Sequence, residues 1–480
     1  MSDLKNKFLY QAALALSQLL FPLITYPWLT RTLGPEGLGK VGYIEFTAGL
    51  IFTIFSIGIS YYGVREIAKE RNNTDTRSKL TSQLLLLHLI SMLLGIAVFL
   101  AIVLLNKKIV ADKELILLGS VYILAQVFAL EWYLQGMEKF SFIAKRNILI
   151  RIAGIIAILL LVRKKEDYII YFGIITVSQA IIAVAACIHI LKENKISLAD
   201  ISFKQHFKPL LWFFLTTSFI SIYVFFDTII LGFLTEDATV GYYTLAIRIV
   251  KMPLLLLLTF NTILFPRISF LNKENDMEKI RHYYKLSLEF IFTFTLPLCL
   301  GIFILSPEII QLIAGDSFSP SVNVLRVLAA LPLIICINNF LVLQLLAPMH
   351  KEKKIVWSVL AGSICSIVLL FSLIPSMKEE GAAYATLATE FLVMLFCIYF
   401  SWTSIKESVP VKSILFSCLF SLVTIPAAWL IRDLSLSLLW SFIVIVLITA
   451  TVYFLLQYFV AKNKIVDESV LFIKKTVARK

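Results

Sequence analysis

The sequence predicts an all-α, polytopic membrane protein with about 14 transmembrane helices. Hydrophobic residues make up 59% of the 480 positions and charged residues only 16%, with a mean hydropathy of +0.88. A chain of this composition has more apolar surface than one aqueous core can bury, so we expect that surface to face lipid. The apolar stretches are continuous rather than alternating, which favours helices over the strands of a membrane barrel.

We place fourteen spans, most of them near the roughly 20 residues that a helix needs to cross about 30 Å of hydrocarbon. Their predicted bounds are 9–30, 42–63, 82–105, 115–135, 145–162, 168–191, 210–234, 240–265, 286–305, 322–347, 355–374, 381–403, 412–431 and 436–460. The gaps between them are short, so we expect no attached soluble domain. The longest gap on the outer side, 306–321, is consistent either with a short interfacial helix ended by Gly315 or with an ordinary connection.

The basic residues alternate between the gaps that separate the spans. Of the 44 Lys and Arg, 30 fall at the two chain ends and in the even-numbered gaps, and 10 fall in the odd-numbered gaps, when a basic residue in the first two positions of a span is counted with the gap before it. Because basic residues collect on the cytoplasmic side, we expect a multi-pass protein of the cytoplasmic (inner) membrane with both termini in the cytoplasm. This distribution explains the net charge of +13 by topology, and we expect no nucleic-acid partner.

Several kinds of chemistry lack a motif in this sequence. The six cysteines all lie within predicted spans, without a CxxC pair or a histidine cluster, so we interpret them as packing residues and expect no metal site and no cofactor. No GxxxxGK[ST] motif occurs, so the chain is not expected to use ATP. Lys5 and Lys7 precede a hydrophobic run that is too long for a signal peptide, so we expect the first span to stay attached. We expect no catalytic residues.

Weak internal symmetry predicts two like-oriented halves. Val41-Gly42-Tyr43 at the start of span two resembles Val240-Gly241-Tyr242 at the start of span eight. Parallel halves related by an axis along the membrane normal are one established transporter plan. We therefore expect an N-lobe of spans one to six over residues 1–200 and a C-lobe of spans seven to twelve over 201–408. Spans thirteen and fourteen and a cytoplasmic tail would occupy 409–480.

Four basic side chains lie beyond the first two residues of a predicted span, where a charge costs about 2.5–3.5 kcal/mol on insertion scales. We expect Arg151, Arg248, Lys251 and Arg326 to pair with acids or to line a hydrated cavity. Arg326 and Arg31, which ends span one, could instead extend to the membrane interface. Lys251 has no acid at matching depth in its own half and is the strongest candidate for a cavity cation.

Acidic side chains at matching depths offer partners for two of these cations. Asp227 lies near the depth of Arg248, and Glu131 lies near the depth of Arg151, counting about 1.5 Å per helical residue. Each could form a structural pair, and Asp227 could instead act in gating or ion coupling.

The remaining polar side chains within spans have the same two interpretations. Glu45 and Glu390 are further candidates for binding a coupling cation. His88 and His189 are interpreted as interhelical hydrogen-bond partners rather than proton relays. Asn338, Asn339 and Gln344 on span ten either bind sugar hydroxyls or join helices, and joining helices is the commoner use.

A family resemblance appears at the end of the first span. The segment is Tyr26-Pro27-Trp28-Leu29-Thr30-Arg31-Thr32-Leu33-Gly34-Pro35-Glu36-Gly37-Leu38-Gly39-Lys40-Val41-Gly42. It resembles the opening signature of the bacterial polysaccharide transporters (O-antigen flippases) of the multidrug/oligosaccharidyl-lipid/polysaccharide exporter superfamily. The match continues through Tyr62-Gly63-Val64-Arg65-Glu66-Ile67-Ala68, and later through Gly315-Asp316-Ser317-Phe318, Val324-Leu325-Arg326-Val327-Leu328 and Gly381-Ala382-Ala383-Tyr384-Ala385-Thr386.

The resemblance implies two six-helix lobes in a V around a cationic cavity. It also implies a flippase that moves an undecaprenyl-pyrophosphate-linked oligosaccharide to the outer leaflet of a bacterial inner membrane by alternating access. Its partners would be the lipid-linked glycan, membrane lipid, and a glycan polymerase or assembly proteins. A diphosphate needs cations, and the expected set is Arg31, Arg151, Arg248, Lys251 and Arg326. The glycines of the signature, with Pro35, are interpreted as turn residues.

Three other functions remain open at this point. A multidrug exporter of the same superfamily would carry a binding acid in an apolar chamber, which the surplus of intramembrane cations disfavours. A membrane glycosyltransferase or polymerase would change glycan linkages, and a channel would pass current in a planar bilayer.

Overall fold

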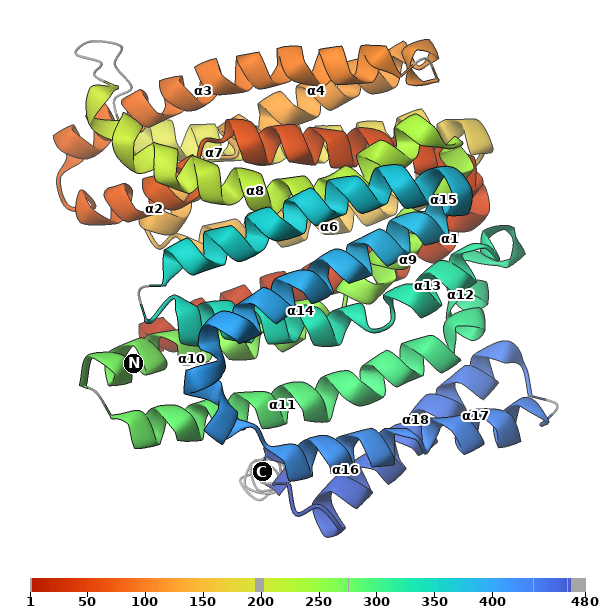
Figure 1. Ribbon diagram of the computed structural model, residues 1–480. Helices are drawn as coiled ribbons and strands as arrows, with labels where there is room; N and C mark the ends of the chain where they lie inside the picture. The colour runs from red at the N-terminus through yellow and green to blue at the C-terminus, as the bar shows by residue number, and fades with distance from the viewer. Residues whose placement is uncertain are drawn as a thin grey trace. The chain divides into compact units, whose positions relative to one another are not determined.

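The computed structural model describes the backbone of residues 2–106, 108–194, 203–274, 276–349, 351–434, 436–463 and 465–467. Every regular element within these residues is a helix, which confirms the predicted all-α class. The chain forms two compact units, Met1–Thr244 and Leu245–Lys480. Each unit is described by itself below, with the helix labels of Figure 1.

The first unit is built from long apolar helices joined by short connections. Its helices are α1 (Ser2–Phe55), α2 (Ile59–Lys69), α3 (Thr74–Leu105), α4 (Lys113–Phe128), α5 (Glu131–Gly136), α6 (Phe140–Leu161), α7 (Tyr168–Glu193) and α8 (Lys204–Leu234), with short 3-10 turns at Ile109–Ala111 and Lys165–Asp167. The unit ends within α9 (Asp237–Lys251). Within it, α1 packs against α3, α4, α6 and α8, and α4 packs against α7.

The second unit contains the remaining helices. They are α10 (Leu254–Glu274), α11 (Met277–Ile304), α12 (Ser306–Ala314), α13 (Ser321–Leu328), α14 (Leu331–Phe340), a π-helical turn at Leu341–Leu346, α15 (Glu352–Ile405), α16 (Val411–Ser421), α17 (Thr424–Arg432) and α18 (Leu438–Phe459), with 3-10 turns at Asp316–Phe318 and Lys406–Ser408. Its core includes Tyr284, Phe340 and Cys397. A smaller cluster joins Leu305 to the C-terminal helices.

Helix breaks occur at glycine and proline, where leaving the helical conformation costs little free energy. Gly34 has a φ of 67°, a left-handed value that favours glycine, and it interrupts α1 between the first two predicted spans. The chain bends by 43° between α9 and α10. Pro253 lies at this break, and its missing N–H cannot continue the hydrogen bonds of a helix. Of the two interpretations of the gap at 306–321, the structure has the short helix, α12, and Gly315 with a φ of 74° follows its end.

The helix α15 is a hairpin of two arms rather than one straight rod. Lys378 breaks the helical geometry with a φ of 48°. A side chain added at Gly362 in the first arm would meet Thr389 and Val393 in the second, so the arms pack side by side. Figure 1 shows them as the cyan and blue arms of α15. The hairpin thus holds predicted spans eleven and twelve.

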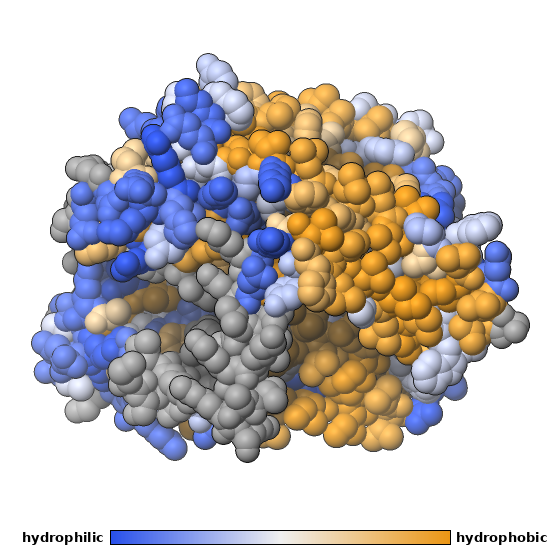
Figure 2. Space-filling model, turned by 90° about the horizontal axis from the view of Figure 1, so that it is seen from below, coloured by the Kyte–Doolittle hydropathy of each residue, from blue (hydrophilic) through white to orange (hydrophobic). Residues whose placement is uncertain are grey.

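Many of the apolar helices are long enough to cross a membrane. Among the described residues, nine helices are long and apolar enough to span, or ten if the bent pair Asp237–Lys251 and Leu254–Asn261 is one span. Two of them, Ala13–Phe55 and Glu352–Ser408, each cover two predicted spans. Figure 2 shows hydrophobic side chains gathered over a continuous region of the face seen from below, beside a hydrophilic region. These findings agree with a polytopic membrane protein.

The boundary between the compact units, at Thr244 and Leu245, falls inside predicted span eight. The span-seven helix α8 packs against α1 and α2 within the first unit. The predicted division of the chain at 200/201 and 408/409 stays a prediction.

Candidate substrate-binding site

Polar contacts at the start of α7 join four helices of the first unit. The Nζ atom of Lys40 lies 2.8 Å from the Oδ2 atom of Asp112, and the hydroxyl of Tyr168 donates to the other carboxylate oxygen at 2.6 Å. Lys108 donates to the carbonyl of Thr235. We call these residues the Asp112 cluster. It fixes the chain around the break in α1 to the starts of α4 and α7.

Two glycines let the backbones of α1 and α9 touch beside this cluster. A Cβ atom on Gly39 would lie 1.7 Å from the carbonyl oxygen of Asp237, and one on Gly241 would lie 2.1 Å from the carbonyl oxygen of Pro35. Real Cβ atoms do not approach this closely, so both positions need glycine. The repeated Val-Gly-Tyr segments therefore lie where these two helices meet, because Gly42 also contacts Thr244.

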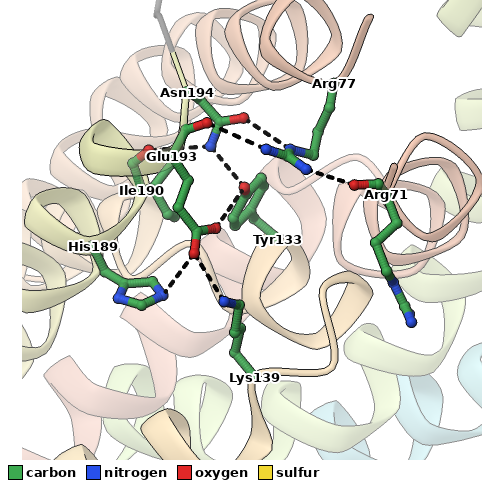
Figure 3. A network of polar contacts seen from close by, with 8 residues as sticks. All are labelled: Arg71, Arg77, Tyr133, Lys139, His189, Ile190, Glu193 and Asn194. Carbon is green, nitrogen blue, oxygen red and sulfur yellow. Dashed lines mark hydrogen bonds and ion pairs between the residues drawn. The ribbon is translucent and has the colours of Figure 1, made fainter. Parts of the chain in front are cut away.

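A second polar network lies at the other end of α7 and is shown in Figure 3. Glu193 accepts from Lys139 at 2.8 Å and from the hydroxyl of Tyr133 at 3.3 Å. Asn194 donates to the same hydroxyl at 2.7 Å and accepts from the buried Arg77 at 3.1 Å. We call these five residues the Glu193 cluster. Its two cations are satisfied within the protein, Lys139 by the carboxylate of Glu193 and Arg77 by amide and carbonyl oxygens. These contacts join α3, α5, α6 and α7.

The second signature segment, at 62–68, packs α2 against α5 near this network. A Cβ atom on Gly63 would lie 2.6 Å from the ring of Trp132, so the glycine admits the indole. Glu66 lies within ion-pair distance of Arg65 and Lys69. Burial acts to raise the pKa of Glu66, but the hydrogen bonds and charges of Lys69 and Arg65 outweigh it and lower the pKa. This segment has a packing role.

Arg146 on α6 is a buried cation with a full set of partners. Its side chain is 4% exposed and lies 3.3 Å from the carboxylate of Glu131. It also donates to the side chain of Asn147 at 3.0 Å and to the carbonyl of Ile182 at 3.2 Å. The sequence predicted a pair between Glu131 and Arg151, and the structure corrects this: Arg146 forms the ion pair.

Arg151, five residues further along α6, has a different environment. Its half-buried guanidinium donates to the hydroxyl of Ser17 at 2.6 Å and to the carbonyl of Leu14 at 3.4 Å, both on α1. Among the described residues no carboxylate lies within 4 Å of it, although the charge of Glu131 acts on it at longer range. Arg151 is therefore held in place by neutral acceptors and keeps its positive charge.

The other predicted residues of the first unit are placed as follows. Asp227 is 2% exposed, and its carboxylate accepts from the hydroxyl of Tyr243 and from the backbone and hydroxyl of Thr228. Arg31 is exposed and donates to the carbonyl of Pro27 at 2.8 Å. Glu45 is half-buried on α1. The predicted pair of Asp227 with Arg248 joins residues of different units and stays a prediction.

In the second unit, Lys251 lies near an acid that is held by an amide. Glu390 on α15 accepts from the side chain of Asn338 at 2.8 Å, and the charge of Lys251 acts on it at longer range. No carboxylate within the described residues lies within 4 Å of the half-buried Lys251 ammonium. The structure thus brings Lys251 and Glu390, two predicted site residues, into one neighbourhood.

The other two predicted cations of this unit lie on α9 and α13. Arg248 is half-buried one turn before Lys251 on α9. Arg326 is exposed in the last turn of α13. The predicted role of each in binding substrate stays a prediction.

Asn338 and Gln344 of the polar patch on span ten join helices, which is the commoner of the two interpretations, whereas the side-chain oxygen of Asn339 has no hydrogen-bond partner among the described residues. The side chain of Gln344 donates to Asn261 at 3.0 Å and accepts from Ser287 at 2.7 Å. Asn338 bonds to Glu390 across α14 and α15. In the first unit, the ring of His88 lies 3.2 Å from the hydroxyl of Ser56, which confirms the interhelical interpretation of that histidine. The interpretation is wrong for His189, whose ring nitrogen lies 3.6 Å from the carboxylate of Glu193 on the same helix, α7.

Sequence reasoning missed Arg146 and Tyr243. Arg146 stood at the predicted boundary of span five and was assigned to the gap, whereas α6 begins six residues earlier, at Phe140. An acid fifteen residues before it, Glu131, was the available signal. Tyr243 gave no signal, because its bond to Asp227 depends on how α8 and α9 pack. In the described part of the chain, no group of three or more metal-ligating side chains lies close enough to hold a metal ion.

Charged side chains held among apolar helices of spanning length define a polytopic integral membrane protein. Solved structures share this fold. One, described as "Lipid II flippase MurJ, inward closed conformation", has a TM-score of 0.77 at 18% identity and covers 95% of this chain and 100% of its own. Another, an inward-facing multidrug resistance transporter of the MATE family, has a TM-score of 0.66 at 14% identity and covers 82% and 95%.

The sequence comparisons give the family. The model of the family described as "Polysaccharide biosynthesis protein" matches residues 4–272, more than half of the chain. This chain therefore belongs to that family. A relative from Escherichia coli (strain K12), named "Putative O-antigen transporter", is 27% identical over 407 residues, which cover 83% of this chain and 96% of the relative. A Shigella dysenteriae protein of the same name is 24% identical and covers 79% and 95%.

Proposed function

We propose that this protein is a flippase that moves a polyprenyl-pyrophosphate-linked oligosaccharide across the bacterial cytoplasmic membrane by alternating access. Its family and the names of its relatives support this class of substrate, and its fold is shared with a lipid II flippase. Transport, rather than change of a glycosidic linkage, is the proposed activity. Both termini would lie in the cytoplasm, as the charge pattern predicts.

The observation that carries this proposal is that each unit has a basic side chain in a spanning helix with no carboxylate of the described residues at ion-pair distance. Arg151 is oriented by neutral oxygens of α1, and Lys251 has no carboxylate within ion-pair distance among the described residues. A positive charge in a span is costly and is usually associated with function. A diphosphate head group supplies the missing negative charge, and hydrogen bonds to it are charge-assisted.

The other predicted residues complete the proposal. Arg31, Arg248 and Arg326 would bind the same head group at successive stages of its passage. Asp227, Glu45 and Glu390 would serve ion coupling or gating. The buried Asp227 is the first candidate, because its hydrogen bond to Tyr243 links the end of α8 to the start of α9. A glycan polymerase and assembly proteins would be the partners that use the product.

The test replaces the cations of α9 in cells that depend on this protein for surface glycan. Lys251→Ala and Arg248→Ala should each abolish surface glycan while leaving the amount of protein in the membrane unchanged. Lys353→Ala is the matched control, because Lys353 is exposed at the start of α15 and should not affect glycan. Purified variants in proteoliposomes should fail to move lipid-linked pyrophosphate oligosaccharide between leaflets.

Other results would point elsewhere. Normal surface glycan from both α9 variants would remove the proposed site. Dye efflux by the purified protein, without movement of lipid-linked glycan, would favour a small-molecule exporter. Altered glycan linkages in a mixture of purified components would favour a transferase or polymerase.

A further inference from the structure

A polar cavity of about 340 Å³ lies in the second unit, away from the residues assigned to transport. Three segments form it: the second and third turns of α11, the chain at 409–416 where α16 begins, and the chain at 461–463 that follows α18. Its polar lining residues are His282, Lys285, Glu289, Lys412, Ser413 and Lys462, followed by the buried Asn463. We call it the Lys412 cavity.

The lining carries an excess of positive charge. Lys285, Lys412 and Lys462 face one acid, Glu289. Within the described residues, no carboxylate lies within ion-pair distance of any of the three lysines, and each is exposed. The ring of Phe416 lies 5.7 Å from the Nζ atom of Lys412. An anion in the cavity would therefore not have to displace a carboxylate from these lysines.

The backbone N–H groups at the start of α16 also favour an anion. Pro410 precedes this helix of 11 residues, and no side chain caps its first turn. The first backbone N–H groups of a helix lack intrahelical partners, and together they form a site that prefers anions. The hydroxyl of Ser413 in this turn is buried and has no hydrogen-bond partner. A buried polar group without a partner is unfavourable, and a bound phosphate oxygen would satisfy it.

The surroundings of the cavity indicate a lipid source for that phosphate. Leu286, Val409 and Phe416 form its apolar wall. Leu415 and Leu419 continue along α16 with 63% and 64% of their surface exposed. This arrangement places a basic, donor-rich end next to a helix face that is suited to acyl chains. Basic pockets between transmembrane helices at the cytoplasmic side bind anionic head groups.

We propose that the Lys412 cavity binds the phosphate of an anionic phospholipid head group, with Lys285, Lys412 and Lys462 supplying charge and Ser413 a hydroxyl donor. The acyl chains lie along the exposed face of α16. This site is separate from the transport cations, because its residues come from α11 and from the two C-terminal spans. It would tie these spans to the anionic leaflet of the membrane.

The test is native mass spectrometry of the purified full-length protein with phosphatidylglycerol, and with zwitterionic phosphatidylcholine as the comparison lipid. Lys285→Gln combined with Lys412→Gln should weaken phosphatidylglycerol binding at least tenfold. Ser413→Val should also weaken it, whereas Ser413→Thr, which keeps the hydroxyl, should bind as the natural protein does. Phosphatidylcholine binding should be the same for all of these proteins.

The matched control removes two positive charges elsewhere at the same end of the unit. Lys353→Gln combined with Lys354→Gln changes the start of α15, outside the cavity, and should leave phosphatidylglycerol binding unchanged. An equal loss of phosphatidylglycerol binding in both double variants would mean that net charge alone causes the loss, and it would overturn the proposal. Displacement of phosphatidylglycerol by an equal concentration of inorganic phosphate would assign the cavity to a small anion and would also overturn it.

Discussion

Two arginines on α6 have opposite kinds of environment although only five residues separate them. Arg146 is 4% exposed and has an ion pair with Glu131, while Arg151 is half-buried and is held by a serine hydroxyl and a carbonyl. In the first region the positive charge is neutralised within the protein. In the second region the charge is oriented but not neutralised. A cation of the first kind holds helices together, and one of the second kind can bind an anionic substrate.

The same contrast extends to other charges of the chain. Lys139 and Arg77 in the Glu193 cluster resemble Arg146, because oxygens of the protein satisfy them. Lys251 in the second unit resembles Arg151, since Glu390 acts on it only at longer range. The presence of a basic residue in a span therefore does not identify a substrate site by itself. The partners of its charge separate the two cases.

The largest effect should come from removing the neutralised cation. Arg146→Gln removes the cation that contacts Glu131 and Asn147, which then retain, among the described residues, only their own hydrogen bond at 3.4 Å. Breaking a buried ion pair costs about 3–5 kcal/mol, and we expect about 3 kcal/mol because the Glu131 side chain remains 43% exposed. Thermal unfolding in detergent should show a clear loss of stability, while transport per folded molecule stays near normal. An Arg146→Gln variant that is stable but cannot transport would contradict the structural role assigned to Arg146.

Removing the oriented cation should have the reverse effect. Arg151→Gln should lower transport by about 10- to 100-fold, because one charge-assisted contact is worth about 1.5–3 kcal/mol. Thermal stability should change little, since the lost partners are one hydroxyl and one carbonyl. Arg151→Lys, which keeps the charge, should retain a large part of the activity. Equal loss in the Gln and Lys variants would mean that geometry rather than charge matters at this position.

A smaller effect is expected from the side chain that orients Arg151. Ser17→Ala removes the acceptor at 2.6 Å and leaves the carbonyl of Leu14. One hydrogen bond to a charged group typically contributes about 1.5–3 kcal/mol, but the free guanidinium can use water in a hydrated path, so we expect at most about a tenfold loss. The loss should appear as weaker binding of the lipid-linked glycan. Ser17→Thr is the control and should transport normally.

The smallest effect concerns pH at Glu66, a paired acid outside the spans. Its pKa is lowered in the folded protein, so its contribution to stability is present above the unfolded pKa and is lost as pH falls through the lower folded value. Thermal unfolding followed from neutral pH into this acid range should show a modest loss of stability. Glu66→Gln should show a smaller loss over the same range. An identical pH profile for the two proteins would contradict a stabilising role for its pairs with Arg65 and Lys69.

Much of the fold could be predicted because the bilayer limits the choices. Long apolar runs must be helices, and Gly34, Pro253 and Gly315 mark where helices break or end. The role of Gly39 and Gly241 could be predicted only in part. A turn role was expected for Gly39, and Gly241 was noted only as part of a repeated segment, whereas both glycines admit the backbone of a helix about 200 residues away in the sequence. Such contacts depend on packing, which a single sequence does not state.

The sequence could predict a set of candidate site residues, but it could not separate the neutralised cations from the oriented ones. Residue type and depth singled out Arg151 and Lys251, because few charges lie in the spans. Depth also suggested Glu131 as the partner of Arg151, but helix phase decides the partner, and Arg146 faces Glu131 instead. The amide that holds Glu390 lies 52 residues away, on another helix. Distinguishing a neutralised cation from an oriented one needs these contacts.

The central claim is that oriented, un-neutralised cations bind the pyrophosphate, and binding to the double variant Arg151→Gln with Lys251→Gln tests it most directly. The measurement is the affinity of purified protein for lipid-linked pyrophosphate oligosaccharide, compared with the same glycan on an uncharged lipid. We predict that the double variant binds the charged ligand at least 100-fold more weakly and binds the uncharged ligand as the natural protein does. Unchanged affinity for the charged ligand would contradict the account.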